Sequence, residues 1–374
     1  MKIRAAVIAG IVLTGLVVPA DAAEPSRLRQ DAAALSAAGV TGVQARADGG
    51  RTEVATAGVA DRRTGRPVPA NGYFRIASTG KTFKAVVVLQ LVGEGRLSLE
   101  DPVERWLPGA IRGNGNDGRR ITVRQLLQHT HGLTDDFPDF ATEADFYRHR
   151  FDRYSSEDLL KRTLRHPPAF EPGQQWSYSN IGYVLLGMIV ERVTGHSWYD
   201  ELQARVIRPL GLKHTRPDRS PVLPAPHARS YQPFEQGRLI DVTDQILNDL
   251  DGSLVSTTED LNEFFQAVFD GRLLKPAQLT EMTTNLRDLD PEIAQLMPNS
   301  QYGLGIFKRP LPCGGEYWGH GGGDGGFITE TGVTTDGRRS AAVSMSSVLG
   351  REWSDALRQQ HLADQLIGDA LCNR

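Results

Sequence analysis

A serine and a lysine, Ser78 and Lys81, stand three positions apart in residues 74–92, FRIASTGKTFKAVVVLQLV. These residues fit two kinds of site. GKT ends a phosphate-binding loop, and S-x-x-K places an amine beside a nucleophile. The phosphate loop also needs a glycine five positions before the glycine of GKT, and that position holds Arg75. The Arg75 side chain would keep phosphate away from the backbone, so the spacing excludes a nucleotide loop and leaves attack on a carbonyl.

Helical geometry decides which amine can assist the serine. Residues 78–94 contain AVVVLQLV without polar alternation and are too long for an ordinary strand, so we predict a buried helix that is apolar nearly all round. Residues three apart lie on nearly one face of a helix, whereas residues six apart diverge by about 120°. Lys81 can therefore lie beside the Ser78 hydroxyl and accept its proton, and Lys84 cannot. The backbone N–H groups at the start of this helix, that of Ser78 among them, can stabilise an oxyanion.

Two further stretches place polar residues beside apolar or glycine-rich segments. WSYSNIGYVLLG puts Tyr178 and Asn180 at the start of an expected helix over residues 180–194, and YWGHGGGDGGF puts His320 on an expected edge strand. Each residue taken alone has a structural interpretation. Ser78 can cap its helix, Tyr178 and Asn180 can cap the next one, and His320 can be a strand histidine among turn glycines. The three stretches together favour catalysis.

The combination resembles the three signatures of the serine penicillin-recognising hydrolases, a family that includes the serine β-lactamases. These signatures are the S-x-x-K nucleophile, the Y-x-N loop and the K/H-x-G strand, and the chain has STGK, YSN and HGG in the same order. The flanking text LLQHTHGL, PGQQWSYSNIGYVLLG and YGLGIF is similar as well. The likeness covers essentially the whole chain after residue 22. Within the family the chain looks most like secreted D-alanyl-D-alanine carboxypeptidases, with class C β-lactamases, esterases and aminopeptidases as cousins.

The resemblance implies a catalytic role for four residues. Ser78 would attack the carbonyl and become acylated, and Lys81 and Tyr178 would move its proton, with either of them as the base. His320 stands where the family often has lysine, and it would position or protonate the leaving group. Water would then release the acyl group, and neither a metal nor an organic cofactor is implied.

The resemblance also implies contacts to the substrate. Asn180 would bind the acyl amide of the substrate, and Gly321, Gly322 and Gly323 would lie along it. The Gly323 amide would pair with the Ser78 amide to form the oxyanion hole.

The chain departs from the carboxypeptidase pattern where those enzymes bind the terminal carboxylate of the substrate. They carry hydroxyl residues within and just after the H-x-G strand, and this chain has Gly321 and Gly323. A basic residue expected near the start of that strand is replaced by Phe307, although Lys308 and Arg309 follow. Each lost charge-assisted contact would cost about 1.5–3 kcal/mol. The residues for acylation are therefore complete, and the specificity for a free carboxylate is in doubt.

Other motifs carry less weight. His129 and His131 have the H-x-H spacing of metal ligands, with Asp135 and Asp136 close by, but no third and fourth ligand are evident. We therefore interpret LLQHTHGL as the end of a helix over residues 121–130 and expect no metal site. The chain contains no G-x-S-x-G, which argues against an α/β-hydrolase.

The order of the predicted elements indicates an α/β protein of the α+β type. Residues 40–61 and the segments after residue 302 predict strands, and helical patterns fill most of the middle. We expect a mixed, mainly antiparallel sheet flanked by helices and built from both termini, with an inserted all-helical lobe. The resemblance names this the β-lactamase/transpeptidase-like fold. The α/β lobe would comprise residues 23–80 and 250–374, and the helical lobe residues 81–249. Further helices are expected over residues 155–165, 257–270 and 353–371.

The first residues have the pattern of an export signal. Lys2 and Arg4 precede a short apolar run and an Ala-Asp-Ala site, so we predict cleavage after Ala22 and a secreted protein without residues 1–22. The alternative is a membrane anchor, but the run falls short of the roughly 20 apolar residues that span a bilayer. No later segment is long and apolar enough, so we expect no membrane anchor.

Cysteine content and charge agree with an exported enzyme. We expect the two cysteines, Cys313 and Cys372, to form a disulfide, the alternative being two buried thiols. A formal net charge of −3 gives no basic excess for a nucleic-acid partner. We expect a monomer whose partner is a small molecule or a peptide, such as a cell-wall peptide, an ester or a β-lactam.

These observations lead to one prediction of function with named alternatives. We predict a secreted serine hydrolase that forms an acyl-enzyme on Ser78 and resembles a penicillin-binding D-alanyl-D-alanine carboxypeptidase. An esterase, a D-aminopeptidase or amidase, and a class C-type β-lactamase use the same scaffold. A penicillin-binding sensor or decoy that is acylated without turnover is the non-enzymatic alternative.

Overall fold

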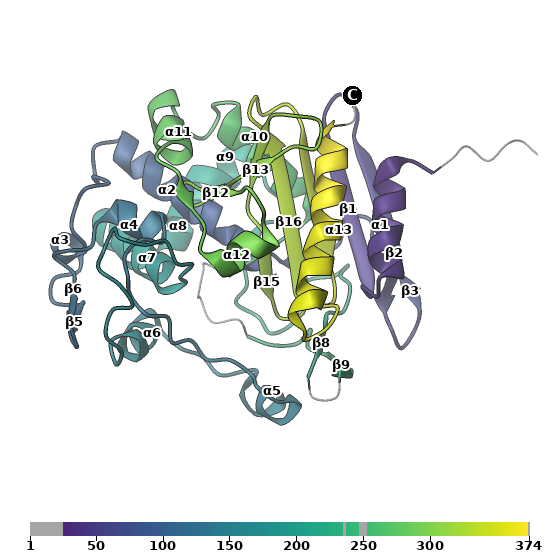
Figure 1. Ribbon diagram of the computed structural model, residues 1–374, viewed down its shortest axis with the longest axis horizontal. Coiled ribbons are helices and arrows are strands. Elements are labelled where there is room, and N and C mark those ends of the chain that lie inside the picture. The colour runs from purple at the N-terminus through teal and green to yellow at the C-terminus, as the bar shows by residue number, and fades with distance from the viewer. Residues whose placement is uncertain (1–24, 235–236, 247–252, 373–374) are drawn as a thin grey trace, which may run out of the picture.

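An antiparallel sheet of ten strands lies at the centre of the part of the chain that the structure describes (Figure 1). This computed structural model describes residues 25–234, 237–246 and 253–372. The expected signal peptide and the expected lobe boundary at residues 249 and 250 lie outside these residues. Both the cleavage and the division into lobes therefore stay predictions.

The two ends of the chain meet in the middle of this sheet. Its order is β11-β12-β13-β14-β16-β17-β1-β2-β3, and β15 pairs with β16. Val43 of β1 lies opposite Met345 of β17, and all of these pairings are antiparallel. The predicted sheet, mainly antiparallel and built from both termini, is confirmed, although its pairings are all antiparallel where a mixed sheet was expected. Its strands are β1 (Gly42–Asp48), β2 (Glu53–Asp61), β3 (Arg66–Pro67), β11 (Arg287–Asp288), β12 (Gln301–Tyr302), β13 (Phe307–Pro310), β14 (Glu316–Gly319), β15 (Gly322–Asp324), β16 (Phe327–Thr334) and β17 (Ser340–Met345).

Within the described residues, three small sheets lie outside the central one. They follow the orders β4-β10-β7, β5-β6 and β8-β9. Their strands are β4 (Phe74–Arg75), β5 (Arg112–Gly113), β6 (Asn116–Asp117), β7 (Arg216–Pro217), β8 (Tyr231–Pro233), β9 (Leu239–Asp241) and β10 (Leu254–Ser256).

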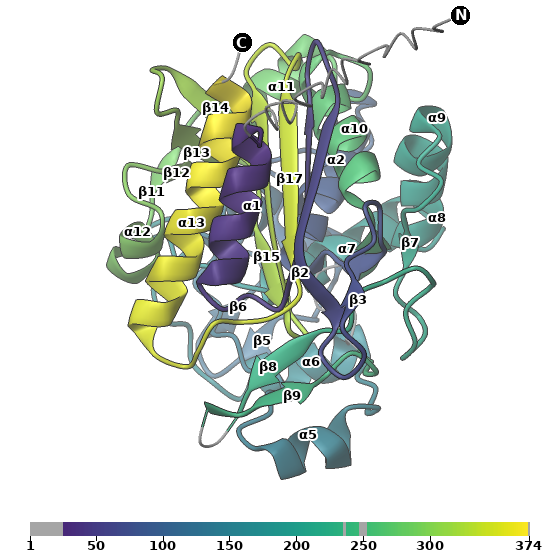
Figure 2. The same ribbon diagram turned by 90° about the vertical axis from the view of Figure 1, so that its right-hand side faces the viewer.

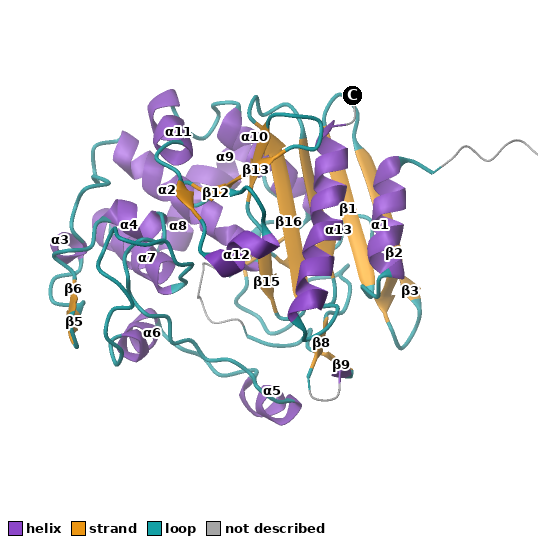
Figure 3. Cartoon of the chain, in the orientation of Figure 1, coloured by secondary structure: helices purple, strands orange, loops and turns teal. Residues whose placement is uncertain are grey.

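Helices cover both faces of the central sheet (Figures 2 and 3). The first and last helices, α1 and α13, lie side by side on one face and enclose a core that includes Leu35, Val43 and Leu366. α10 packs against β1, β16 and β17 on the other face. There it joins a larger core that it shares with α2 and α7, which includes Phe83, Leu185 and Phe264. The helices of the middle of the chain therefore gather on one side of the sheet.

Local sequence explains where the helices begin and end. A capping box of Ser155 and Asp158 starts α6, and Gly195, in the left-handed conformation with φ +78°, ends α7. α4 is shorter than predicted because His129 takes a left-handed φ of +58°. Among the described helices, none combines the length and the hydropathy needed to cross a membrane. The helices are α1 (Arg27–Ala37), α2 (Gly80–Gly93), α3 (Val103–Trp106), α4 (Val123–Leu127), α5 (Glu143–His149), α6 (Ser156–Thr163), α7 (Ile181–Thr194), α8 (Trp198–Leu202), α9 (Arg208–Leu210), α10 (Thr258–Phe269), α11 (Pro276–Thr283), α12 (Pro291–Leu296) and α13 (Trp353–Cys372), with a 3-10 turn η1 (Ala77–Thr79) and a π-helical segment η2 (Gln203–Ile207).

The helix that carries Lys81 is buried nearly all round, as its sequence predicts. Ser78 lies in the 3-10 turn η1, directly before α2, rather than inside the first turn of the α-helix. The Phe83 ring stacks on Phe264 of α10, with ring centroids 3.5 Å apart and planes 8° from parallel. This contact fixes α2 against the helix that covers the sheet.

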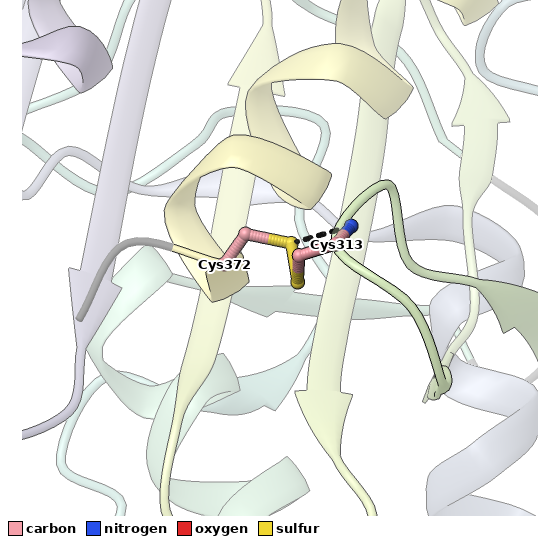
Figure 4. The surroundings of a disulfide bond; sticks show 2 residues. All are labelled: Cys313 and Cys372. Carbon is pink, nitrogen blue, oxygen red and sulfur yellow. Dashed lines mark hydrogen bonds between the residues drawn. A yellow bond between two sulfur atoms is a disulfide. The ribbon is translucent and has the colours of Figure 1, made fainter.

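A disulfide between Cys313 and Cys372 ties the turn between β13 and β14 to the last residue of α13 (Figure 4). The Cys313 N–H also donates a hydrogen bond to Cys372 Sγ at 3.3 Å. The predicted disulfide is confirmed, and it fastens the final helix to the sheet that the helix covers.

Removal of this disulfide is expected to destabilise the fold and leave its secondary structure intact. The cysteines are 59 positions apart, and closing a loop of that length is worth about 4 kcal/mol in the chain-entropy model. A double variant, Cys313→Ser with Cys372→Ser, should lower the free energy of unfolding in urea by up to that amount and keep the circular dichroism spectrum. Reduced wild-type protein is the matched control. Equal stability of the variant and the oxidised protein would contradict the prediction.

Candidate active site

The candidate nucleophile Ser78 lies in a strained turn. Ala77, just before it, has a φ of +46°, which is uncommon for a residue other than glycine. Ser78 is partly exposed, whereas Lys81 is fully buried. Lys81 Nζ lies 3.0 Å from Ser78 Oγ, so the hydroxyl and the amine are neighbours, as the helical spacing predicts.

The Lys81 amine is also held by residues from the segment around Asn180. Its Nζ donates a hydrogen bond to Asn180 Oδ1 at 2.8 Å. It lies 4.8 Å from the ring centroid of Tyr178 and 5.6 Å from that of Tyr183. A buried amine is costly unless polar or aromatic partners replace its water, and these residues are such partners.

The carboxylate of Asp135 anchors the loop Tyr178-Ser179-Asn180, called the Y-S-N loop below. It accepts hydrogen bonds from the backbone N–H of Asn180 at 2.6 Å and of Ile181 at 3.1 Å, and from the Ser179 hydroxyl at 2.7 Å. These N–H groups lie at the start of α7, so Asp135 caps that helix from a distant segment. Burial raises the pKa of Asp135 above its ordinary value, and the loop's hydrogen bonds oppose that rise.

His320 lies in the break between β14 and β15 and is only 2% exposed. Its carbonyl accepts hydrogen bonds from Thr331 Oγ1 of β16 at 2.8 Å and from Thr79 Oγ1 of η1 at 3.3 Å. Its ring centroid is 6.3 Å from that of Tyr178, and its Nε2 lies 3.2 Å from Tyr302 Oη. The nucleophile turn, the Y-S-N loop and the break before β15 therefore meet in one cluster.

β15 passes so close to the nucleophile that one position must be glycine. A Cβ on Gly322 would lie 2.2 Å from the carbonyl oxygen of Ile76 and 3.0 Å from the Ser78 nitrogen. Because these are backbone atoms, no side chain fits at this position. Gly323 follows directly and pairs with Ile328 of β16. Its role in an oxyanion hole with the Ser78 amide stays a prediction.

A buried carboxylate explains the glycine at position 321. A Cβ on Gly321 would lie 2.4 Å from Glu330 Oε1. Glu330 is buried beside Arg309, whose Nη1 is 3.4 Å away and which also pairs with Asp364 of α13. Burial raises the pKa of Glu330 to about 7, opposed by Arg309. The carboxylate thus fills the space that a hydroxyl residue at position 321 would need.

The residues at positions 307–309 are committed to contacts within the protein. Phe307 packs on the rings of Tyr302 and His320, with centroids 4.5 and 5.1 Å away. Lys308 Nζ pairs with Glu316 at 2.6 Å. Arg309 is held by Glu330 and Asp364. The wall beside His320 is therefore aromatic where a cation was expected.

Arg75, which excludes the nucleotide loop, anchors the chain just before η1. Its fully buried guanidinium donates to Asp218 Oδ2 at 2.5 Å and to the carbonyl oxygens of Thr243 and Gln245 at 2.6 and 2.9 Å. Burial raises the pKa of Asp218, and the charge of Arg75 opposes that rise. One arginine therefore joins the nucleophile turn to two distant loops.

The H-x-H pair is arranged for hydrogen bonding within the protein. His129 Nδ1 accepts from the Ser179 N–H at 3.2 Å, and its Nε2 lies 3.1 Å from Tyr302 Oη. His131 Nδ1 accepts from the Leu133 N–H at 3.0 Å. Burial lowers the pKa of His131 to about 4 and that of His129 well below its ordinary value. Within the described residues, no three His, Cys, Asp or Glu side chains are grouped so that they could hold a metal.

Three residues of this cluster received no role from the sequence. They are His129, Asp135 and Tyr302. The segments LLQHTHGL and YGLGIF resemble the family's sequences, but their distance along the chain from Ser78 does not predict that they contact it.

An antiparallel sheet with helices on both faces, a helical insert and a serine–lysine pair before a buried helix defines the class. The protein is a serine hydrolase with the β-lactamase/transpeptidase-like fold. The comparison with protein families identifies the family within this class. The chain belongs to the beta-lactamase family, because the family model described as Beta-lactamase matches residues 28–366.

Curated relatives carry different activities in their names. Penicillin-binding protein 4* of Bacillus subtilis (strain 168) is 29% identical over 287 residues, which cover 73% of this chain and 60% of the relative. Esterase EstB of Burkholderia gladioli is 36% identical over 169 residues, which cover 42% of this chain and 41% of the esterase. The chain therefore matches less than two thirds of the length of each of these two relatives.

Solved structures match over almost their whole length. A D-stereospecific amidohydrolase from Streptomyces sp. is 37% identical with a TM-score of 0.79, over 89% of this chain and 97% of that one. A D-amino acid amidase from Ochrobactrum anthropi SV3 is 27% identical with a TM-score of 0.77, over 91% and 96%. The predicted fold is confirmed, and the relatives span several hydrolytic activities.

Replacement of Asp135 by asparagine is expected to slow acylation of Ser78. One of the two carboxylate oxygens that accept hydrogen bonds from the Y-S-N loop becomes an N–H₂ group, which cannot accept. The loop therefore loses a charged hydrogen bond worth roughly 1.5–3 kcal/mol. The rate of acylation by penicillin, followed by intact mass, should fall about 10- to 100-fold. Asp136→Asn is the matched control, since Asp136 pairs with Arg162 and His166 instead. Equal rates in the two variants would contradict the anchoring role.

Alanine at position 321 is expected to cost more stability than alanine at position 323. The Cβ at position 321 must displace the buried Glu330 carboxylate, and overpacking of this kind costs roughly 1–3 kcal/mol. A Cβ at Gly323 would meet a movable methyl, Ile328 Cδ1, at 2.9 Å. Urea unfolding of Gly321→Ala and Gly323→Ala measures the difference. In a Glu330→Ala background the penalty at position 321 should shrink, and an unchanged penalty would refute the explanation.

Proposed function

We propose that this chain is an exported serine hydrolase that acylates Ser78 and cleaves amides or esters of D-configured acyl groups, with a leaving group that carries no carboxylate. One observation carries the proposal. Lys81 contacts both Ser78 and Asn180, as acylation requires, while the positions expected to bind a substrate carboxylate are glycine or phenylalanine.

The reaction needs one nucleophile and one route for its proton. Ser78 Oγ forms a bond to the carbonyl carbon, and the bond from that carbon to the leaving nitrogen or oxygen breaks. The serine proton passes to Lys81 or Tyr178 and then to the leaving group. Water attacks the acyl-enzyme, returns a proton to Ser78 and releases the acid.

The residues on the leaving-group side support a leaving group without a carboxylate. Phe307 packs on His320, and Arg309 is paired inside the protein with Glu330 and Asp364. Gly321 cannot be given a hydroxyl without displacing the Glu330 carboxylate. A terminal carboxylate would therefore find few charged partners here and would lose the strong contacts that favour its binding.

We assign the side chain of the acyl group to a cavity of about 350 Å³. It opens beside Asp324, the last residue of β15, and Phe140, Tyr154 and Gln245 help to line it. Volumes of this size are typical of small-molecule pockets, which start near 300 Å³. The carboxylates of Asp139, Asp145 and Asp324 line it together with the guanidinium of Arg162. Because carboxylates predominate, the lining favours neutral or cationic acyl groups over anionic ones.

The amidohydrolase and amidase structures support the D-configured acyl group, because both names specify D-substrates. The D-alanyl-D-alanine carboxypeptidase prediction is the second candidate. The similarity to penicillin-binding protein 4* favours it.

Competing substrates separate the two candidates. We expect kcat/KM for ammonia release from D-phenylalanine amide to exceed kcat/KM for D-alanine release from a D-Ala-D-Ala peptide by about tenfold or more, because each missing carboxylate contact is worth roughly that factor. L-Phenylalanine amide tests the stereochemistry, and Ser78→Ala should abolish both reactions and the mass gain with penicillin. Faster release of D-alanine would move the assignment to the carboxypeptidase. A single stoichiometric acylation without turnover would indicate a sensor.

A further inference from the structure

His129 accepts backbone hydrogen bonds from the residues on both sides of Tyr178. Its carbonyl accepts from the Ser177 N–H at 3.0 Å, and its Nδ1 accepts from the Ser179 N–H at 3.2 Å. Its ring lies 4.5 Å from the Tyr178 ring, centroid to centroid. The residue is completely buried and holds a left-handed φ of +58°. Such backbone strain in a buried residue persists where the surrounding structure imposes that conformation.

The hydrogen bonds of His129 set the direction of its proton. Because Nδ1 accepts a backbone N–H, the neutral ring carries its hydrogen on Nε2. Nε2 lies 3.1 Å from Tyr302 Oη and therefore donates to it. Burial lowers the pKa of His129, which keeps the ring neutral.

The same reasoning fixes the next two members of the chain of contacts. His320 Nδ1 lies 2.6 Å from the carbonyl oxygen of Gly321, which can only accept, so Nδ1 carries the hydrogen. When the His320 ring is neutral, its Nε2 is an acceptor, and the Tyr302 hydroxyl, 3.2 Å away, is its donor. The Tyr183 hydroxyl is farther from Tyr302 Oη, at 3.5 Å. Every bond now has one direction, from His129 to Tyr302, from Tyr302 to His320, and from His320 to Gly321.

We propose that His129 and Tyr302 are positioning residues that lock His320 in the Nδ1–H tautomer and hold the Y-S-N loop at a fixed distance from the strand that follows His320. This inference rests on the proposed function for its kinetic consequence. It also narrows the role of His320. Because both ring nitrogens are bonded within the protein, His320 acts by orienting the strand after it and is not the acid that protonates the leaving group.

The groups around His320 come from four segments. They are Tyr178 of the Y-S-N loop, Tyr302 of β12, Phe307 of β13 and, through its charge, His129 after α4, with Glu330 behind Gly321. Tyr302 Oη is the atom that contacts both imidazoles. Tyr302→Phe therefore removes the connection and keeps the packed ring.

The test combines histidine tautomers with acylation kinetics. In wild-type protein labelled with ¹⁵N-histidine, long-range ¹H–¹⁵N NMR should show opposite neutral tautomers, Nε2–H for His129 and Nδ1–H for His320. Tyr302→Phe should shift the Nε2 resonances of both rings and lower the rate constant of acylation by penicillin about tenfold, with little change in the concentration that gives half-maximal rate. Tyr317→Phe is the matched control, because Tyr317 is equally buried but faces the core under α13.

A second variant separates positioning from folding. His129→Asn keeps a short acceptor for the Ser179 N–H and tolerates the left-handed backbone, but it cannot reach Tyr302. It should fold and show the same kinetic loss as Tyr302→Phe. Identical tautomers for the two rings in wild type, or unchanged His320 resonances and acylation in both variants, would overturn the inference. The hydrolase function would stand in that case, whereas a wild-type protein that neither releases ammonia from D-phenylalanine amide nor is acylated by penicillin would refute the function alone.

Discussion

The site depends on one constraint, the placement of a lysine amine inside the protein. Lys81 is fully buried, and an amine removed from water is costly unless neighbours replace its hydration. Ser78 and Asn180 lie within hydrogen-bond distance of its Nζ, and the faces of Tyr178 and Tyr183 lie within cation–π range. Because these partners come from the turn before α2 and from the start of α7, satisfying one amine brings the candidate nucleophile and the Y-S-N loop together.

The surrounding fold keeps this arrangement rigid from two directions. On one side, α2 is fixed against α10 by the stack of Phe83 on Phe264, and Arg75 holds the backbone before η1. On the other, β15 reaches the turn so closely that Gly322 has no space for a side chain. The sheet gains its own support from α13, which the disulfide fastens at its end. The nucleophile turn therefore lies between a buried helix and a paired strand, and neither can move without breaking core contacts.

Local patterns predicted the parts of the site that are close in sequence. Helical spacing placed Lys81 and not Lys84 beside Ser78, and the similarity of YSN and HGG to family signatures pointed to Asn180 and His320. Contacts between distant segments left no such trace. Tyr302 lies 173 positions from His129 and belongs to a strand of two residues, too short for any periodicity. No local pattern indicates that Glu330, nine positions along the chain, fills the space beside Gly321.

This last contact separates the chemistry of the site from its specificity. The groups proposed to move a proton lie on the side of α2 and α7, whereas the positions expected to contact a leaving group lie in or beside β13, β15 and β16. On those strands the buried pair of Glu330 and Arg309 takes up both the space and the charge that a carboxylate-binding site would use. Removing one partner of a buried ion pair strongly destabilises the fold, because the other charge is left unpaired. Substitution of either residue alone is therefore unfavourable. The strands can thus differ from those of a carboxypeptidase as a unit, while the serine, the lysine and the asparagine stay as they are.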